Sequence, residues 1–111
     1  MTHKPGDVVL IPFPFTDQST RKRRPVLILS NLDDYGDFLA VAITSQPGHI
    51  DAIALADTDF QQGTLPKPSW LRAARIFTLN RQNIAGVFGR LTPHALKHLH
   101  AQVCDQLGCG A

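Results

Sequence analysis

The chain is divided into short apolar or alternating segments by frequent turn residues, and this division constrains its fold more than any other feature. Eight glycines and eight prolines occur in 111 residues. Short runs bounded by Gly, Pro, Asp and Ser are typical of β-strands. The pattern predicts strands at residues 8–12, 25–29, 38–43, 53–56, 69–73, 75–79 and 85–89. Because closure removes the exposed edges of an open sheet, we expect these strands to form a small barrel.

A single helix is expected after the strands. Thr92 provides an N-cap, and Pro93 suits the first helical turn, where no N–H is needed. Gly108 and Gly110 end the helix. An apolar stripe at helical spacing packs on the sheet. It consists of Leu96, Leu99, Val103 and Leu107. The expected fold is mainly β with a C-terminal helix.

Size and composition indicate one domain. With 111 residues, 43% of them hydrophobic, the chain can bury a core of its own. No apolar stretch approaches the roughly 20 residues that cross a bilayer, and the N-terminus lacks the apolar region of a signal peptide. We therefore expect a soluble, cytoplasmic protein with no membrane partner. Cys104 and Cys109 are expected to be free thiols, because a bridge between them closes only a small loop.

Four adjacent cations, Arg21, Lys22, Arg23 and Arg24, run directly into the apolar segment that starts at Pro25. The proline fixes φ and the residues after it must pack, so we expect the cations to be held at the mouth of a strand. Like charges held together favour a polyanionic partner, and RNA and an acidic protein segment both qualify. The alternative is a solvated loop beside a core strand.

Acidic and basic residues occupy different parts of the chain. The formal net charge is only +2, and the nine acidic residues are all aspartates. Six of them lie between residues 25 and 60, a stretch without lysine or arginine, and six cations lie between residues 60 and 104, a stretch without acid. Net charge says little about partners when opposite signs are segregated. The absence of glutamate excludes any mechanism that needs a glutamate acid or base.

The segment Pro-Phe-Pro-Phe-Thr-Asp, residues 12–17, separates the first expected strand from the cations. Its two prolines remove ladder donors, so it cannot be a central strand and is expected to leave the sheet as an extended, exposed loop. Phe13 and Phe15 in this loop either contact a partner, such as an RNA base, or form a plain hydrophobic lid.

Five short motifs occur in the order and at the separations typical of one protein family. They are Gly6-Asp7-Val8-Val9, Arg24-Pro25-Val26-Leu27, Ala42-Ile43-Thr44-Ser45, Ser69-Trp70-Leu71-Arg72 and Ile76-Phe77-Thr78-Leu79. Over about residues 5 to 100 the chain resembles the MazF/PemK family. The resemblance implies a single domain over residues 1–111, a small SH3-like barrel of the CcdB/MazF type, and a homodimer. It also implies a toxin of a type II toxin–antitoxin pair that cleaves RNA without ribosomes, metals or cofactors.

The resemblance implies three residues that act on a phosphate. Arg24 matches the family's arginine after the first loop, and its planar fork suits two phosphate oxygens in the transition state. Thr44 matches a hydroxyl at the end of the third strand that bonds a phosphate or ribose. Arg72 matches an arginine that acts as the general acid in some members. Taken as residues alone, Thr44 also fits a strand-end turn, and Arg72 fits a surface cation on an alternating strand.

Both of the family's usual carboxylate bases are missing. The loop glutamate falls near Ser19, and Ala74 stands where an Arg-x-Asp pair has its aspartate. Asp17 is the expected substitute, and the nearby cations keep it ionised. His49 is a second candidate because histidine titrates near neutral pH, or it is an incidental loop residue. Solvent is the third candidate for the base.

Six further residues are expected to bind RNA around the catalytic residues. Cations contact phosphates, and an aromatic side chain stacks on a base in single-strand recognition. The set is Arg21, Lys22, Arg23, Ser45, Trp70 and Arg75. Trp70 equally fits a core or dimer-interface position.

A zinc site at the C-terminus is the alternative to an ordinary helix surface. His94 and His98 share a helix face, and His100 and Cys104 are near them. A closed zinc site needs four converging ligands, and histidines are common on exposed helix faces. We therefore predict no metal site.

Two functions from different classes follow. In the first, the chain is a metal-independent, sequence-selective endoribonuclease that cleaves single-stranded RNA by attack of the ribose 2′-OH. A cognate antitoxin with an acidic, largely disordered tail then covers its groove. In the second, the loss of both carboxylates leaves a catalytically degenerate barrel that binds RNA or a protein without cutting. A gyrase-poisoning toxin is a remoter alternative, since fold does not determine function.

Overall fold

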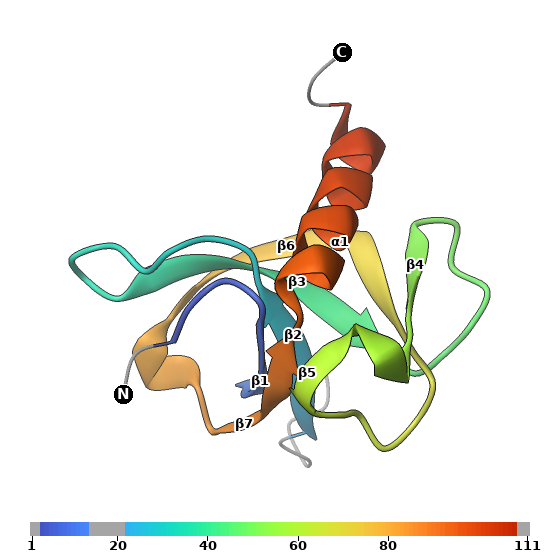
Figure 1. The fold of residues 1–111 in the computed structure, drawn as a ribbon. Helices are drawn as coiled ribbons and strands as arrows, with labels where there is room; N and C mark the ends of the chain where they lie inside the picture. The colour runs from blue at the N-terminus through green and yellow to red at the C-terminus, as the bar shows by residue number, and fades with distance from the viewer. Residues whose placement is uncertain (1–2, 14–21, 109–111) are drawn as a thin grey trace.

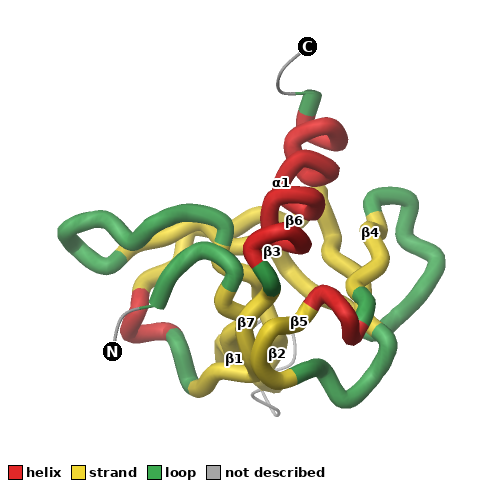
Figure 2. Tube along the Cα trace, viewed as in Figure 1, coloured by secondary structure: helices red, strands yellow, loops and turns green. Residues whose placement is uncertain are grey.

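The computed structural model describes residues 3–13 and 22–108. These residues form seven strands, two short 3-10 helices and one α-helix (Figures 1 and 2). In chain order the elements are β1 (Asp7–Phe13), β2 (Lys22–Ile28), β3 (Asp37–Thr44), β4 (Ala52–Leu55), η1 (Asp57–Asp59), β5 (Phe60–Gly63), β6 (Ser69–Asn80), η2 (Arg81–Asn83), β7 (Gly86–Leu91) and α1 (Pro93–Leu107). The predicted class, mainly β with a C-terminal helix, is confirmed.

All seven strands belong to one antiparallel sheet, in the order β4-β6-β3-β2-β1-β7-β5. The sheet curls around on itself (Figure 1), with β4 and β5 as its two edges. Only η1 and Ala56 separate these two edge strands in the chain. The expected small barrel is thus confirmed as a curled, half-closed sheet.

The two faces of the sheet carry separate hydrophobic clusters. Leu27 belongs to one cluster, and its neighbours Val26 and Ile28 belong to the other, as the alternation of side chains along a strand requires. All three are fully buried, so the prediction that the residues after Pro25 pack into the core is confirmed. α1 covers the cluster that contains Leu27.

The ends of α1 form as predicted. The Thr92 hydroxyl oxygen accepts a hydrogen bond from the Ala95 N–H at 3.0 Å, and Pro93 is the first helical residue. Gly108 caps the C-terminus with φ +77°, a left-handed conformation that favours glycine. Among the described residues, no helix is long and apolar enough to cross a membrane.

The buried face of α1 differs from the predicted stripe. Its end points away from the sheet (Figure 1), so Leu107 is 55% exposed. Cys104 is disulfide-bonded, so the expectation of a free thiol there is wrong, and Cys109 lies outside the described residues. The buried residues of the helix are Ala95, Leu99 and Val103.

Three strand predictions need correction. Residues 69–73 and 75–79 form one continuous strand, β6, whose register against β3 shifts between Val41 and Ala42. β5 was not predicted, because Phe60–Gly63 is short and mostly polar. β1 ends at Phe13, one residue beyond the predicted end at Pro12, so Pro12 and Phe13 belong to the strand and not to the expected loop of residues 12–17. Since β7 pairs with β1 only as far as Leu10, Pro12 has a strand neighbour on one side alone and its missing N–H is tolerated there.

Candidate functional site

The candidate site lies where β2 and β3 separate. Their ladder ends at the pair Val26 and Ala42. The next residue of β2, Pro25, has no N–H to extend it. Beyond this point Pro25 and Ile43 line two neighbouring pockets, so the proline that follows the cations opens the sheet at the site.

The first pocket, called here the arginine pocket, has a volume of about 310 Å³. Its lining combines cations, a hydroxyl and an apolar floor. Arg24 and Arg75 are exposed, whereas Thr44 and Arg72 are partly buried. No carboxylate lines this pocket within the described part of the chain. The lining residues are Arg24, Pro25, Ala42, Ile43, Thr44, Arg72, Arg75 and Phe77.

A bulge in β6 brings two arginines of the pocket together. Arg72 pairs with Ala42 of β3, but the next β3 residue, Val41, pairs with Ile76, which leaves residues 73–75 as extra residues in β6. In a regular strand, side chains three positions apart point to opposite faces. Because the bulge resets this alternation, Arg72 and Arg75 both line the arginine pocket.

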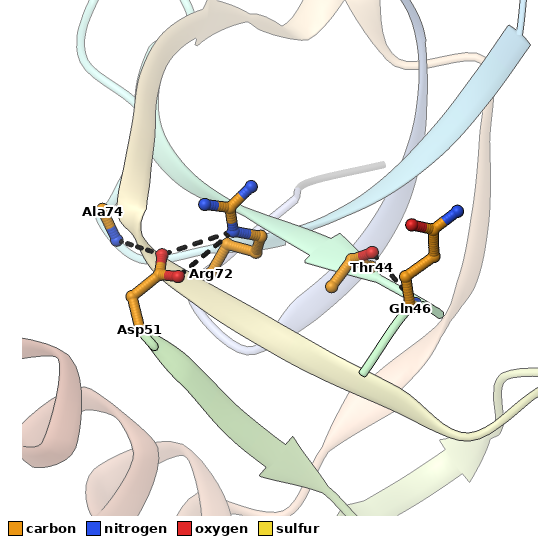
Figure 3. Close-up of polar contacts among 5 residues, drawn as sticks. All are labelled: Thr44, Gln46, Asp51, Arg72 and Ala74. Carbon is orange, nitrogen blue, oxygen red and sulfur yellow. Dashed lines mark hydrogen bonds and ion pairs between the residues drawn. The ribbon is translucent and has the colours of Figure 1, made fainter. Parts of the chain in front are cut away.

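Asp51, immediately before β4, holds one of these arginines. Its carboxylate oxygens lie 3.3 and 3.4 Å from Nε of Arg72 (Figure 3). The Ala74 N–H donates to the same carboxylate at 3.0 Å, and the Ala73 N–H donates to the Asp51 carbonyl oxygen at 3.2 Å. The Asp51 carboxylate therefore contacts both the guanidinium and the bulged backbone of β6.

These contacts shift the titration of Asp51. Burial by itself raises the pKa of Asp51, but hydrogen bonds from the Ala74 amide and from its own backbone amide, together with the Arg72 charge, outweigh burial. The pKa therefore lies below its ordinary value of 3.8, and the carboxylate is ionised at neutral pH.

Thr44 ends β3 beside Arg72 (Figure 3). Its hydroxyl oxygen accepts a hydrogen bond from the Gln46 N–H at 3.1 Å, which is the strand-end turn that the residues alone suggested. The same side chain also lines the arginine pocket. Because this bond uses the oxygen as acceptor, the O–H remains able to donate to a ligand.

The second pocket, called here the lysine pocket, has a volume of about 360 Å³ and shares Arg24, Pro25 and Ile43 with the first. Its floor is apolar and its rim carries cations and hydroxyls. The hydroxyl of the buried Ser69 donates to the carbonyl oxygen of the exposed Lys67 at 2.9 Å and so fixes the backbone of this part of the pocket. The remaining lining residues are Arg23, Ser45, Leu65, Pro66, Lys67, Ser69 and Phe88.

The structure brings together most of the predicted site residues that it describes. Arg24, Thr44, Arg72 and Arg75 line the arginine pocket, and Arg23 and Ser45 line the lysine pocket. Trp70 lines neither pocket, although it is the pairing partner of Thr44 and lies two residues from Arg72 along β6. His49 also lines neither pocket.

Several predictions fall on parts that the structure does not describe. Asp17, Arg21 and Phe15 lie outside the described residues, and for Lys22 and Phe13 only the strand backbone is described. For the zinc alternative, residues 3–13 and 22–108 contain no group of three or more His, Cys, Asp or Glu side chains that could hold a metal ion.

Sequence reasoning missed Asp51 and Lys67 as parts of this region. Asp51 reaches Arg72 from 21 positions away in the chain, and no local motif indicates that approach. Lys67 is flanked by Pro66 and Pro68. Because proline restricts the backbone, this pattern indicates a rigid, exposed turn and could have predicted that the Lys67 charge is held in place.

The fold is similar to that of several solved structures. An endoribonuclease in complex with its cognate antitoxin, from a mycobacterial species, has a TM-score of 0.76 at 21% identity, covering 99% of both chains. A MazE–MazF structure (Form-II) from Deinococcus radiodurans has a TM-score of 0.70 at 18% identity, covering 97% of both chains. The Mycobacterium tuberculosis toxin MazF-mt6 has a TM-score of 0.68 at 16% identity, covering 92% of this chain and 96% of that one. These likenesses define the class of fold.

The family of the chain is shown by a family model that matches nearly the whole sequence. No curated protein matches the chain. A model of the family described as PemK-like, MazF-like toxin of type II toxin-antitoxin system matches residues 4–107. The chain belongs to this family, and the resemblance carried by the five motifs is confirmed.

Proposed function

We propose that residues 1–111 act as one domain, the toxin of a type II toxin–antitoxin pair, which cleaves single-stranded RNA at selected sequences without a metal ion. The observation that carries this proposal is one pocket lined by Arg24, Arg72, Arg75 and Thr44 together. A pocket with several cations and no lining carboxylate in the described residues suits a phosphate group.

The chemistry that fits this pocket is internal transfer at the RNA phosphate. A base removes the proton of the ribose 2′-OH, and the 2′ oxygen forms a bond to phosphorus. The bond from phosphorus to the 5′ oxygen then breaks, and an acid gives that oxygen a proton. The products are a 2′,3′-cyclic phosphate and a 5′-hydroxyl end.

The proposed roles follow from the charge that develops in this reaction. Arg24 stabilises the negative charge of the pentacoordinate phosphorane, and Arg72 protonates the leaving oxygen. Thr44 donates a hydrogen bond to a phosphate or ribose oxygen. Preorganised donors of this kind each contribute about 3–4 kcal/mol to lowering a barrier.

Asp17 remains our proposal for the general base. It belongs to the segment between β1 and β2, and the two strands that flank this segment both reach the site: Pro12 pairs with Arg23, and Arg23 lines the lysine pocket. His49 is the second candidate, five residues beyond Thr44 in the chain.

RNA is proposed to run across both pockets. They share Arg24, so consecutive nucleotides can contact one continuous cationic surface. Arg21, Lys22, Arg23 and Arg75 contact phosphates in this proposal, Ser45 donates a hydrogen bond, and Trp70 stacks on a base.

The proposed partners are a cognate antitoxin and a second copy of the chain, in the cytoplasm. Two of the similar structures are described as complexes, one of an endoribonuclease with its cognate antitoxin and one of MazE with MazF. An acidic, disordered antitoxin segment would place carboxylates where RNA phosphates bind, which explains how it blocks the site.

A binding module without cleavage is the second candidate function. The observation that favours it is the pocket lining itself, which in the described residues contains cations and a hydroxyl but no carboxylate to serve as a base. Such a surface binds RNA whether or not it cleaves.

Incubation of the purified protein with a long defined RNA in EDTA distinguishes the two. The enzyme yields recurrent cuts with 2′,3′-cyclic phosphate and 5′-hydroxyl ends, and Arg24→Ala slows them about 100-fold or more. Arg81→Ala, which removes an exposed arginine of η2 outside both pockets, is the matched control and leaves cleavage unchanged. Intact RNA that still binds the folded protein contradicts the enzyme and supports the module.

A further inference from the structure

We infer that Asp51 is a positioning residue for the proposed RNA cleavage: it clamps the bulge of β6 so that Arg72 and Arg75 act on the same phosphate. This inference rests on the proposed function. It supplies a role for a carboxylate that lies outside every motif of the sequence analysis.

The bulge in β6 leaves backbone amides that need new acceptors. A bulge removes strand residues from the ladder and leaves their amides without a partner strand. Opposite β3, the bulged residues are 73–75. The Ala73 N–H donates to the Asp51 carbonyl oxygen and the Ala74 N–H to the Asp51 carboxylate, at 3.2 and 3.0 Å. The backbone carbonyl of Asp51 thus extends the pairing of β4 with β6 by one residue, and its carboxylate satisfies the Ala74 amide in the bulge.

Asp51 also fixes the orientation of the Arg72 guanidinium. Asp51 contacts Arg72 through Nε, the nitrogen nearest the side-chain stem. A guanidinium carries five N–H donors in a rigid plane, so holding Nε fixes the plane and leaves the donors of the terminal nitrogens for another oxygen. In Figure 3 the terminal nitrogens of Arg72 lie on the side away from Asp51.

The carboxylate beside Arg72 comes from outside β6. Ala74 has no polar side chain, so β6 itself cannot hold Arg72 from that position. The Asp51 carboxylate reaches the same place from the start of β4, in contact with the Ala74 amide (Figure 3). A carboxylate is therefore present beside Arg72, and another part of the chain supplies it.

The directions of the Arg72 and Arg75 side chains both depend on the bulge that Asp51 holds. Without the bulge, Arg72 and Arg75 would point to opposite faces of β6. Loss of the Asp51 carboxylate removes the side-chain acceptor of the Ala74 amide and the partner of Arg72 at once, while the backbone carbonyl of residue 51 still accepts from the Ala73 amide. A displacement of about 1 Å in a catalytic group can slow a reaction about 100-fold, so cleavage is sensitive to this clamp.

The test compares Asp51→Asn with wild type in three measurements: kcat and KM for RNA cleavage, thermal unfolding, and solvent exchange of the Arg72 Nε–H in protein with ¹⁵N-labelled arginine. Asparagine keeps an oxygen for the Ala74 amide but loses the charge that holds Arg72. Asp33→Asn is the matched control, because Asp33 also accepts two backbone amides, those of Tyr35 and Asp37, and lines neither pocket.

The clamp predicts that Asp51→Asn lowers kcat about 10-fold to 100-fold with little change in KM, while Asp33→Asn leaves both unchanged. In an Arg72→Ala background, Asp51→Asn has little further effect, because the two residues act as one unit. The Arg72 Nε–H exchanges faster in Asp51→Asn than in wild type.

Three results overturn the inference: unchanged kcat in Asp51→Asn, an equal loss in the Arg72→Ala background, or unchanged exchange of the Arg72 Nε–H. The exchange measurement does not need catalysis. If wild-type protein leaves RNA intact, the proposed function fails, and exchange alone then decides whether Asp51 holds Arg72.

Discussion

Two aspartate–arginine ion pairs in this molecule make the same kinds of contact but have different roles. Asp7 binds Nε of Arg90 at 2.8 Å, and Asp51 binds Nε of Arg72 at 3.3 Å. Each aspartate also accepts a backbone amide, from Lys4 in the first pair and from Ala74 in the second. The first pair joins β1 to β7, and the second lies at the β6 bulge beside the arginine pocket.

Burial separates the two pairs. The Asp7 side chain is only 4% exposed, against 15% for Asp51. Asp7 and Arg90 are direct partners in the ladder of β1 and β7 and line neither pocket. The shorter pair, on the more deeply buried aspartate, joins two paired strands, whereas the looser pair at the bulge holds an arginine that lines the arginine pocket. The position of an ion pair in the sheet therefore indicates whether it joins strands or holds a side chain at the pocket.

The largest effect on stability is expected at the buried pair. Asp7→Asn removes the charge opposite Arg90. It lowers the free energy of unfolding by about 1–3 kcal/mol, because the Arg90 guanidinium then lacks the carboxylate that it pairs with. Cleavage per folded molecule stays unchanged. Chemical denaturation and RNA cleavage on the same preparations measure both. A loss of cleavage in fully folded Asp7→Asn would contradict the separation of the two pairs.

A smaller effect is expected in the pH dependence of stability. Because the folded pKa of Asp51 lies below its ordinary value of 3.8, its ionised form stabilises the native state. This contribution is complete above pH 3.8 and is lost as pH falls through the folded pKa. Denaturation of wild type and Asp51→Asn from pH 7 to pH 2 measures it. The two unfolding free energies should converge in acid, and a constant difference over this range would refute an ionised clamp.

The smallest effect is expected at Lys67, which forms no ion pair with a carboxylate among the described residues. Lys67 is exposed on the rim of the lysine pocket. Lys67→Ala should weaken RNA binding modestly at every sequence and reduce the salt dependence of log Kd by about 0.7, one phosphate contact on a single strand. Lys97→Ala on α1, outside both pockets, is the control. An unchanged salt slope in Lys67→Ala would place the RNA away from this pocket.

Features set by neighbouring residues were predictable from the sequence. Thr92 and Pro93 determine where α1 begins, and Gly108 determines where it ends, because caps act over a few residues. The resemblance also identified Arg24, Thr44 and Arg72, which the fold brings to one pocket from three strands.

The bulge and its clamp were not predictable in the same way. The sequence pattern predicts two strands, at residues 69–73 and 75–79, with Ala74 between them. Ala74 instead falls inside the bulge of one long strand, β6. Asp51 has no motif of its own, since its contacts depend on how the segment before β4 meets that bulge, 21 residues further along the chain.

The most direct test of the separation between the two pairs is a comparison of Arg72→Ala with Arg90→Ala, measuring cleavage rate per folded molecule and the free energy of unfolding for each. We predict that Arg72→Ala slows cleavage about 100-fold or more and changes stability by less than about 1 kcal/mol. Arg90→Ala should lower stability by about 3 kcal/mol, because it leaves Asp7 buried without its partner, and should leave cleavage unchanged. Equal losses of cleavage in both variants, or a loss of stability alone in Arg72→Ala, would contradict the account.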